Sequence, residues 1–236
     1  MRKKALLLLL LFAAAAFAYT DRSFSMAVQV NGDGSAHVIE KTVFTLDNPE
    51  ETNTFEYYLL QGEATLIDWQ RFSKNIRYHY AGALSNLRVI AAREFELGHT
   101  SASVSMEYDV SGLFLPEQVN NRVTRYSMDK KKLSFGVPGE LSLSSGHELF
   151  MKLPADALNV ELVPVGGVTY EGHNELSWKG PLIGIWDVSF EREASLSQEV
   201  KDFFIDSYQG FSESYLWLVA LVFLAIIAVK LAKLRE

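Results

Sequence analysis

A serine and a lysine provide the first spacing that is able to do chemistry. Ser127 and Lys130 form an S-x-x-K pair, the spacing at which a lysine can activate a serine one helical turn earlier. A membrane-anchored hydrolase of envelope substrates is the enzyme that such a pair predicts. The two residues lie in "RYSMDKKKL", a charged stretch without a helical apolar face. We therefore interpret the spacing as accidental and keep the hydrolase as the alternative.

The histidines do not form a metal site by their spacing. They are scattered singly, and none has a histidine partner four residues away on one helical face. The sequence also contains no cysteine, no Gly-rich phosphate loop, no H-E-x-x-H and no G-x-S-x-G. We therefore assign no catalytic, cofactor-binding or metal-ligating residue and expect no cofactor. The five histidines are His37, His79, His99, His147 and His173.

An acidic loop over residues 47–52 offers oxygens for a calcium ion. Asp47, Glu50 and Glu51 are the kind of ligands that calcium prefers, but the alternating Asp, Gly and Asn pattern of a dedicated calcium loop is absent. A solvated turn is the favoured interpretation, and the need for calcium stays open. Asp33 in "NGDG" is explained by a turn.

Other carboxylates alternate along predicted strands, where edge protection and solubility account for them. They are Glu94 with Glu96, and Glu107 with Asp109.

Three tryptophans are compatible with either a binding or a structural role. Trp69, Trp178 and Trp186 can form a sugar-stacking platform or pack in the core. Each lies in a segment patterned for burial, so core packing is favoured.

The N-terminal segment is typical of a secretory signal peptide. "MRKKALLLLLLFAAAAFAYT" has a basic start, an apolar run and an Ala-x-Ala site ending at Ala18. We expect residues 1–18 to be this peptide and the mature chain to start near Tyr19. Without cleavage, the run would stay as a signal anchor, and the sequence leaves this open.

The C-terminal segment predicts one transmembrane helix over residues 214–234. Leu216 to Val229 contains no charged residue, and twenty helical residues span about 30 Å, the thickness of the hydrocarbon core. A buried core helix is the alternative. Basic residues near the end of the chain place residues 235–236 in the cytoplasm and residues 19–214 outside. We therefore expect a single-pass type I protein of the cell membrane.

Composition limits what the outer part can bind. Three basic residues in each terminal segment and Glu236 lie outside residues 19–214, which leaves 16 basic against 28 acidic residues and a net charge of −12. This balance disfavours nucleic acid and acidic lipid headgroups as partners. Because there is no cysteine, no disulfide supports the fold, and burial must do so.

The hydrophobic pattern predicts a mainly β, sandwich-like ectodomain with one or two helices. "RSFSMAVQV" and "AHVIEKTVFTL" flank "NGDGS" and predict a β-hairpin. "TFEYYLL" predicts a third strand, and apolar residues at steps of three and four predict a helix near 64–80. "NLRVIAAREFEL" and "ASVSMEYDV" predict two more strands around a turn. Together these segments form a predicted N-terminal subdomain, residues 19–112.

A second subdomain is predicted over residues 113–194. The segment 111–129 loses periodicity and is interpreted as a connection. Six short runs with turns between them then predict strands; they are "KKLSFGV", "HELFMKLP", "NVELVPV", "GVTYEG", "NELSWKG" and "GIWDVSFER". Residues 195–213 predict an amphipathic juxtamembrane helix and linker.

The opening "VQVNGDGSAHVIEKTVFTL" resembles the N-terminal segment of uncharacterised bacterial and archaeal predicted membrane proteins, whose secreted β-domain begins with a strand, a DGS turn and a V-x-E strand. "LFMKLPADALNVELVPV" and "NELSWKGP" are similar to later strands of such ectodomains. The resemblance implies location and architecture, and it carries no functional residues.

These observations favour a binding or assembly function for a membrane-anchored extracytoplasmic domain. It would act as an accessory subunit of a membrane complex or as a cell-envelope surface protein. Its expected partners are the lipid bilayer and a membrane protein that contacts the ectodomain or the transmembrane helix, where small residues allow close approach. These small residues are Ala220, Ala225 and Ala228.

Overall fold

The computed structural model describes residues 21–62, 64–96, 99–120, 122–133, 135, 137, 139–163, 168–172 and 174–194. The predicted signal peptide (1–18), juxtamembrane helix (195–213), transmembrane helix (214–234) and cytoplasmic end (235–236) lie outside these residues. Within the described ranges, no helix is both long enough and apolar enough to cross a membrane.

The chain divides into two compact units. Residues 1–117 and 125–192 form the first, and residues 118–124 and 193–236 form the second. The described part of the second is a turn in which Val119 N donates to Val123 O and Ala194 N donates to Arg122 O. The predicted division at residue 112 stays a prediction.

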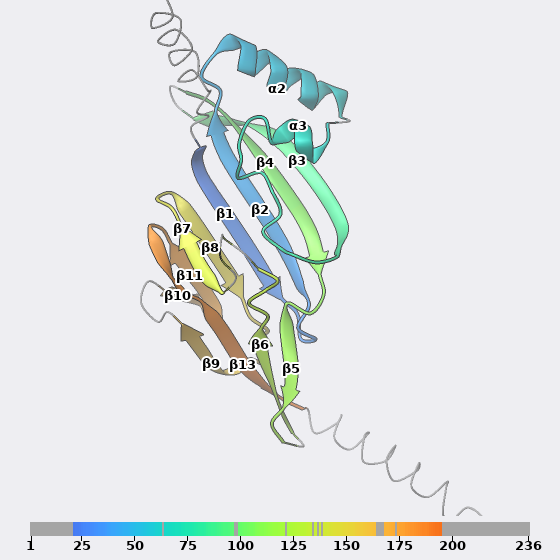
Figure 1. Cartoon of the computed structure of the whole chain (residues 1–236), viewed down its shortest axis with the longest axis vertical. Coiled ribbons are helices and arrows are strands. Elements are labelled where there is room, and N and C mark those ends of the chain that lie inside the picture. Colours follow the sequence, from blue (N-terminus) through green and yellow to red (C-terminus); the bar gives the residue numbers. More distant parts are fainter. Residues whose placement is uncertain are drawn as a thin grey trace, which may run out of the picture. The chain divides into compact units, whose positions relative to one another are not determined.

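The predicted N-terminal hairpin is confirmed (Figure 1). β1 (Asp21–Val30) and β2 (Ala36–Thr45) pair antiparallel around the turn 31–35. Gly34 adopts φ +82 in this turn, and a Cβ there would lie 2.3 Å from Phe114 O. The turn therefore requires glycine both for its backbone angle and for the close approach.

A seven-stranded sheet is built around this hairpin, in the order β10-β11-β8-β1-β2-β4-β3. β1 pairs parallel with β8, so strands from both halves of the chain share one sheet. The two strands predicted from "NLRVIAAREFEL" and "ASVSMEYDV" are confirmed as β3 and β4, although β4 begins earlier than expected, at His99. The remaining bounds are β3 (Leu84–Glu96), β4 (His99–Val110), β8 (His147–Lys152), β10 (Val168–Gly172) and β11 (Glu175–Lys179).

The other strands of the described residues form two smaller sheets, and the prediction of a mainly β domain is confirmed. One has the order β5-β6-β13-β9 and the other pairs β12 with β7. Their bounds are β5 (Phe114–Gln118), β6 (Val123–Met128), β7 (Glu140–Leu143), β9 (Leu158–Val163), β12 (Leu182–Ile185) and β13 (Asp187–Glu193).

The segment 111–129 is therefore not a structureless connection, because it contains β5 and β6. Conversely, "KKLSFGV" forms no strand in its described part; Leu133 only makes an isolated bridge with Tyr80. β7 and β12 were not predicted. They are four residues long, too short for an alternating pattern to stand out.

The prediction of a third strand over "TFEYYLL" is wrong, because this segment lies in helix α2 (Pro49–Gln61). The prediction of a loop over residues 47–52 is also wrong, because α2 begins at Pro49. Asn48 caps the helix by accepting from Glu51 N, Pro49 occupies the first turn, and Gly62 closes the C-terminus at φ 65. These are ordinary helix start and stop signals. They outweigh the aromatic run, which resembles a strand in composition.

The predicted helix near 64–80 is also wrong in extent, because α3 covers only Leu66–Trp69. The apolar residues that suggested it are still buried, Phe72 and Ile76 among them. Ser73 Oγ accepts a hydrogen bond from Asn75 N, a local side-chain bond that competes with helical pairing. The chain thus buries the same residues through irregular backbone.

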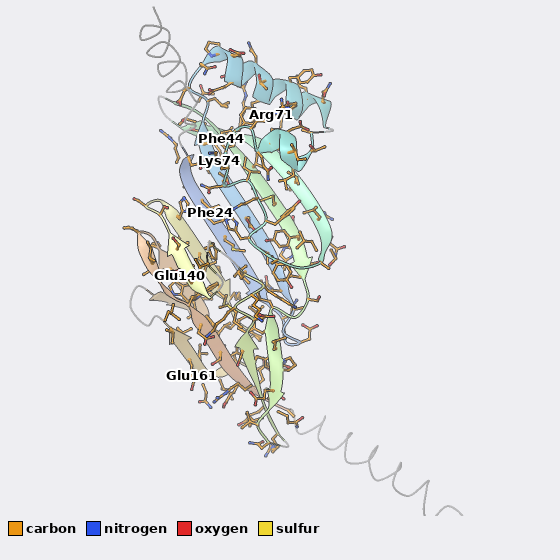
Figure 2. The ribbon with its side chains drawn as sticks, in the orientation of Figure 1. Phe24, Phe44, Arg71, Lys74, Glu140 and Glu161 are labelled. Carbon is orange, nitrogen blue, oxygen red and sulfur yellow. The ribbon has the colours of Figure 1, made fainter. Side chains whose placement is uncertain are left out.

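The core lies against the inner face of the large sheet. Under α2, the rings of Phe44, Phe55, Trp69 and Phe72 form a cluster with centroids 5.5–6.1 Å apart. Figure 2 shows Phe44 near the end of β2 that leads to α2. Because side chains alternate along a strand, the central strands β1 and β2 each have one buried row and one more exposed row.

Candidate functional site

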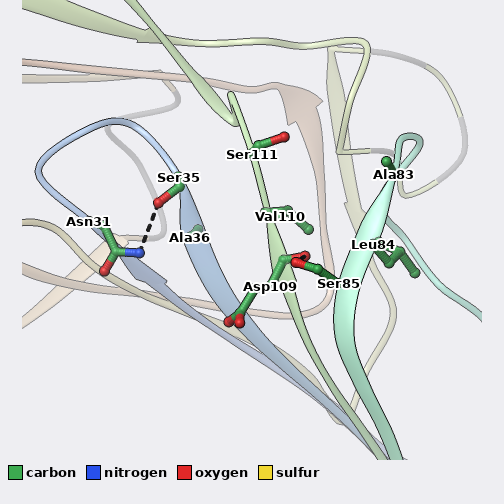
Figure 3. A pocket seen from close by; sticks show the side chains of 9 residues that line it. All are labelled: Asn31, Ser35, Ala36, Ala83, Leu84, Ser85, Asp109, Val110 and Ser111. Atoms are coloured by element: carbon green, nitrogen blue, oxygen red, sulfur yellow. Dashed lines mark hydrogen bonds between the residues drawn. The ribbon is translucent and has the colours of Figure 1, made fainter.

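A polar cavity lies where the β1–β2 hairpin, the start of β3 and the end of β4 meet (Figure 3). Its volume is about 470 Å³, within the usual range for small-molecule sites. Its lining residues are Asn31, Ser35, Ala36, Ala83, Leu84, Ser85, Asp109, Val110 and Ser111.

The hairpin turn holds one wall of this cavity. Asn31 Nδ2 donates to Ser35 Oγ at 2.9 Å, as drawn in Figure 3. Ser35 N and Oγ both donate to Asp33 Oδ1, which lowers the pKa of the Asp33 carboxyl. Asp33 thus belongs to the turn, as predicted, and the turn fixes two polar side chains on the wall.

A β-bulge in β3 holds the opposite wall. The pairing of β3 with β4 shifts register between Ser85 and Arg88, and Asn86 within the bulge adopts φ 53. Left-handed backbone at a non-glycine residue is uncommon, and bulges often re-aim side chains next to binding sites. Here the bulge brings Asn86 Nδ2 within 2.6 Å of Asp109 Oδ2.

Asp109 is the ionisable group of the lining. Its Oδ1 lies 2.7 Å from His37 Nδ1, and the other ring nitrogen of His37 lies 3.3 Å from Glu107 Oε1. The bond from Asn86, and after it the contact with His37, lowers the pKa of Asp109. Since both of its oxygens already have partners, this carboxylate is poorly arranged to attract a free cation.

The remaining edge of the cavity is fixed through Ser111. Its carbonyl oxygen accepts from the Tyr80 hydroxyl at 2.7 Å and from Lys132 Nζ at 3.1 Å. The cavity therefore presents hydroxyl, amide and carboxylate groups on walls tied by hydrogen bonds, beside the apolar Leu84 and Val110. Such a lining suits a neutral molecule that both donates and accepts hydrogen bonds.

A second histidine–carboxylate pair is buried on the other face of the same two strands. Glu40 of β2 is fully buried, and its Oε2 lies 2.6 Å from His79 Nδ1. His79 N and the Tyr108 hydroxyl both donate to Glu40 Oε1. Burial first, and then the charge of Glu40, raises the pKa of Tyr108.

Aromatic rings enclose this buried cluster. Phe24 and Phe135 contact the His79 ring at centroid distances of 4.8 and 5.2 Å. The Phe24 ring also contacts His147, with centroids 5.4 Å apart, and burial lowers the pKa of His147. Glu40, His79 and Tyr108 are all buried and do not line the polar cavity, so we assign this cluster to structure.

Some buried polar atoms have no hydrogen-bond partner. They include Thr42 Oγ1 and the Nε1 atoms of Trp178 and Trp186. The two indoles pack edge to face at 5.8 Å, and Trp69 is also buried. Core packing of the three tryptophans is therefore confirmed, and a sugar platform is not formed by them.

The predicted S-x-x-K pair does not enter the cavity. Ser127 lies on strand β6, and Lys130 Nζ forms an ion pair with Asp187 at 2.6 Å. Neither residue lines the cavity.

The acidic segment 47–52 serves the start of α2. Glu51 accepts from Asp47 N and from Asn48 Nδ2, which completes a cap. Among the described residues, no group of three or more His, Asp or Glu side chains is placed to hold a metal ion.

Sequence patterns missed most of the cavity. Asp109 and Glu107 were noted as alternating carboxylates and assigned to solubility, and His37 was noted only as a single histidine. Asn31, Ser35, Ser85 and Asn86 were not singled out as site residues. A usable signal exists in "SN" at residues 85–86 near the start of β3, because serine and asparagine favour turns and asparagine tolerates left-handed backbone.

Comparisons with known proteins do not assign the chain to a family. No family model matches the chain, and no curated protein sequence matches it. Among solved structures, it is similar to the folded domain of LppM from Mycobacterium tuberculosis, with 7% sequence identity and a TM-score of 0.32 over 78% of this chain and 97% of that one. A likeness at this level carries no argument about this chain.

Proposed function

We propose that this chain is a membrane-anchored extracytoplasmic domain that binds a small, neutral, hydroxyl-rich molecule of the cell envelope, such as a saccharide, in the polar cavity. The apolar segments at both termini support the location. Their arrangement is typical of a signal peptide and a single C-terminal anchor.

Asp109 carries the binding part of the proposal. It lines the cavity and is held from two sides, by His37 on β2 and by Asn86 in the strained bulge of β3. Strained backbone that positions a polar group beside a cavity is a reason to infer function. Each oxygen of the ionised carboxylate has two lone pairs, so beside its present partner it can accept one hydrogen bond from a ligand hydroxyl without reorganising.

The lining also favours a neutral ligand over a charged one. The polar groups beside Asp109 are hydroxyls and an amide, and they come from Asn31, Ser35, Ser85 and Ser111. These groups both donate and accept, as sugar hydroxyls do. The partly buried Leu84 adds apolar surface that can contact the ring carbons of a sugar.

Calorimetric titration of the purified full-length chain in detergent with a panel of neutral mono- and disaccharides tests the proposal. We expect at least one to bind, and Asp109→Ala to weaken it about tenfold or more, the equivalent of a hydrogen bond to a charged group. Glu107→Gln is the control, because Glu107 contacts His37 without lining the cavity. No binding across the panel, or equal loss in both variants, contradicts the proposal.

Protease accessibility in intact cells or spheroplasts tests the location separately. Digestion of the domain from the outside, with the C-terminal end protected, is the expected result. Complete protection of the domain contradicts it.

A further inference from the structure

The outer face of the large sheet carries two parallel rows of side chains that begin at the cavity. Because directly opposite residues of neighbouring strands point to the same face, the strand register defines each row. The first row is polar and starts on the cavity wall. Along β4, β2, β1, β8 and β11 it consists of Asp109, His37, Gln29, Lys152 and Glu175.

The second row lies beside the first on the same face, and its centre is apolar. Ile39 of β2 is 40% exposed, and Ala27 and Phe150 are partly exposed. The short side chain of Ala27 lies between the two larger ones, so this stretch offers a shallow apolar surface. Along the same strands the row consists of Glu107, Ile39, Ala27, Phe150 and Ser177.

The charged side chains of the two rows have partners within the rows. Lys152 Nζ lies 2.7 Å from Glu175 Oε1, and His37 contacts both Asp109 and Glu107. Opposite charges held close together largely cancel for a molecule that approaches from solution. The rows therefore suit a neutral partner, although residues 19–214 as a whole are strongly acidic.

A neutral sugar chain fits these rows better than a peptide or a lipid chain. A sugar ring has apolar C–H faces and hydroxyls around its edge, so an apolar row beside a polar row can contact both. Peptide segments add to a sheet edge, where backbone groups are unpaired, whereas the rows lie between the edge strands β10 and β3. A lipid chain has no hydroxyls to bond the exposed Gln29 and Lys152.

We propose that the two rows bind a linear neutral glycan whose terminal unit occupies the cavity, so that the preferred ligand is an oligosaccharide rather than a single sugar. This inference rests on the proposed function and deepens it, because Asp109 belongs both to the cavity lining and to the polar row. Neighbouring strands are about 4.8 Å apart, so the rows extend about 14 Å from β4 to β8, which is longer than one sugar ring.

Calorimetric titration of the purified full-length chain in detergent with sugars of increasing length tests this inference. The probes are glucose, mannose and N-acetylglucosamine, and their linear oligomers of two, three and four units. We expect the tetrasaccharide of at least one series to bind about tenfold or more tightly than its monosaccharide, since further units add hydrogen bonds and apolar contacts along the rows. The tetramer of galacturonic acid, which is anionic, should bind more weakly.

Three variants separate the rows from the cavity. Gln29→Ala, Ile39→Ser and Phe150→Ala should each weaken tetrasaccharide binding several-fold and leave monosaccharide binding unchanged, whereas Asp109→Ala should weaken both. Ile183→Ser should change neither and is the matched control, because Ile183 is an exposed isoleucine on strand β12 of a separate sheet. Gln29 and Ile39 are exposed, so their variants report on binding even if Phe150→Ala disturbs the fold.

Three results overturn the inference: equal affinity for one and four units, unchanged tetrasaccharide binding in all three row variants, or tighter binding of the anionic tetramer. In each case, monosaccharide binding that Asp109→Ala weakens leaves the cavity proposal standing. Tetrasaccharide binding that depends on the row variants but not on Asp109 contradicts the cavity proposal instead. No binding of any probe contradicts both.

Discussion

Two histidine–carboxylate pairs lie on opposite faces of the same two strands, β2 and β4. Glu40 and His79 are 2.6 Å apart with side chains 0% and 5% exposed, whereas Asp109 and His37 are 2.7 Å apart with side chains 39% and 35% exposed. The contacts have nearly the same length, but their surroundings differ. Since burial decides how much the loss of a hydrogen-bond partner costs, we expect the first pair to hold the fold, whereas the second is exposed enough to contact the proposed ligand.

Removing the buried carboxylate should have the largest effect. Glu40→Ala leaves His79 and the Tyr108 hydroxyl without their partner in the core, and breaking one side of a buried pair costs about 3–5 kcal/mol. We expect a loss of this size in the free energy of urea unfolding. A loss below about 1 kcal/mol would show that the cluster does not hold the fold.

Removing an unpartnered hydroxyl beside this cluster should stabilise the chain. Thr42 Oγ1 is buried without a hydrogen-bond partner on the same row of β2 as Glu40. Thr42→Val keeps the shape and removes the desolvation cost, so unfolding should require about 1 kcal/mol more. Thr42→Ser, which keeps the hydroxyl, is the matched control, and an equal gain in both would contradict the explanation.

Protonation of His147 should make the stability of the folded chain depend on pH. Burial holds its pKa below the unfolded value of about 6.5, so the folded state favours the neutral ring. Asp21 opposes this effect, and His79 adds to it. The stability that the neutral His147 ring contributes is therefore fully present above about pH 6.5 and is lost as the pH falls through the folded-state pKa.

Between about pH 7 and pH 5, the wild-type chain should therefore lose more thermal stability than His147→Gln. The two melting curves, measured over this pH range, check the difference. Equal slopes would mean that His147 does not contribute.

The exposed pair should have the smallest effect on stability. Asp109→Ala removes contacts with His37 and Asn86, which are solvent-exposed, and exposed pairs contribute about 0–1 kcal/mol. We expect urea unfolding to change by less than about 1 kcal/mol while ligand binding falls. A loss as large as that of Glu40→Ala would remove the distinction between the two faces.

Sequence patterns predicted the parts of the fold that depend on local alternation. The β1–β2 hairpin followed from "NGDG" between two alternating runs, and β8, β9, β10, β11 and β13 followed from short apolar runs between turns. The short strands β5, β6, β7 and β12 did not. The parallel pairing of β1 with β8 could not be predicted, because no local pattern records which distant strand is a neighbour.

The helix boundaries failed for a different reason. Asn48, Pro49 and Gly62 were available as cap signals for α2, but the aromatic run "TFEYYLL" was interpreted as a strand by composition. For residues 64–80, the helical spacing of apolar residues was real, yet local hydrogen bonding around Ser73 replaced the helix. Burial of a spaced set of residues does not by itself require a helix.

The candidate site was the least predictable part. Asp109 and His37 are 72 residues apart, and only the β2–β4 register brings them together. The left-handed backbone of Asn86 and its contact with Asp109 depend on the bulge in β3, which no local sequence pattern predicts. The buried partner of Glu40 was equally hidden, because His79 belongs to irregular backbone rather than to a patterned element.

Amide NMR of the full-length chain in nanodiscs, titrated with the saccharide panel, tests the central claim most directly. The account predicts shifts gathered at the cavity, at Asn31, Ser35, Ser85 and Asp109, with the amides of Glu40 and His79 unchanged. No shift with any member of the panel, or shifts gathered at the buried pair instead, would contradict the division of the sheet into a structural face and a binding face.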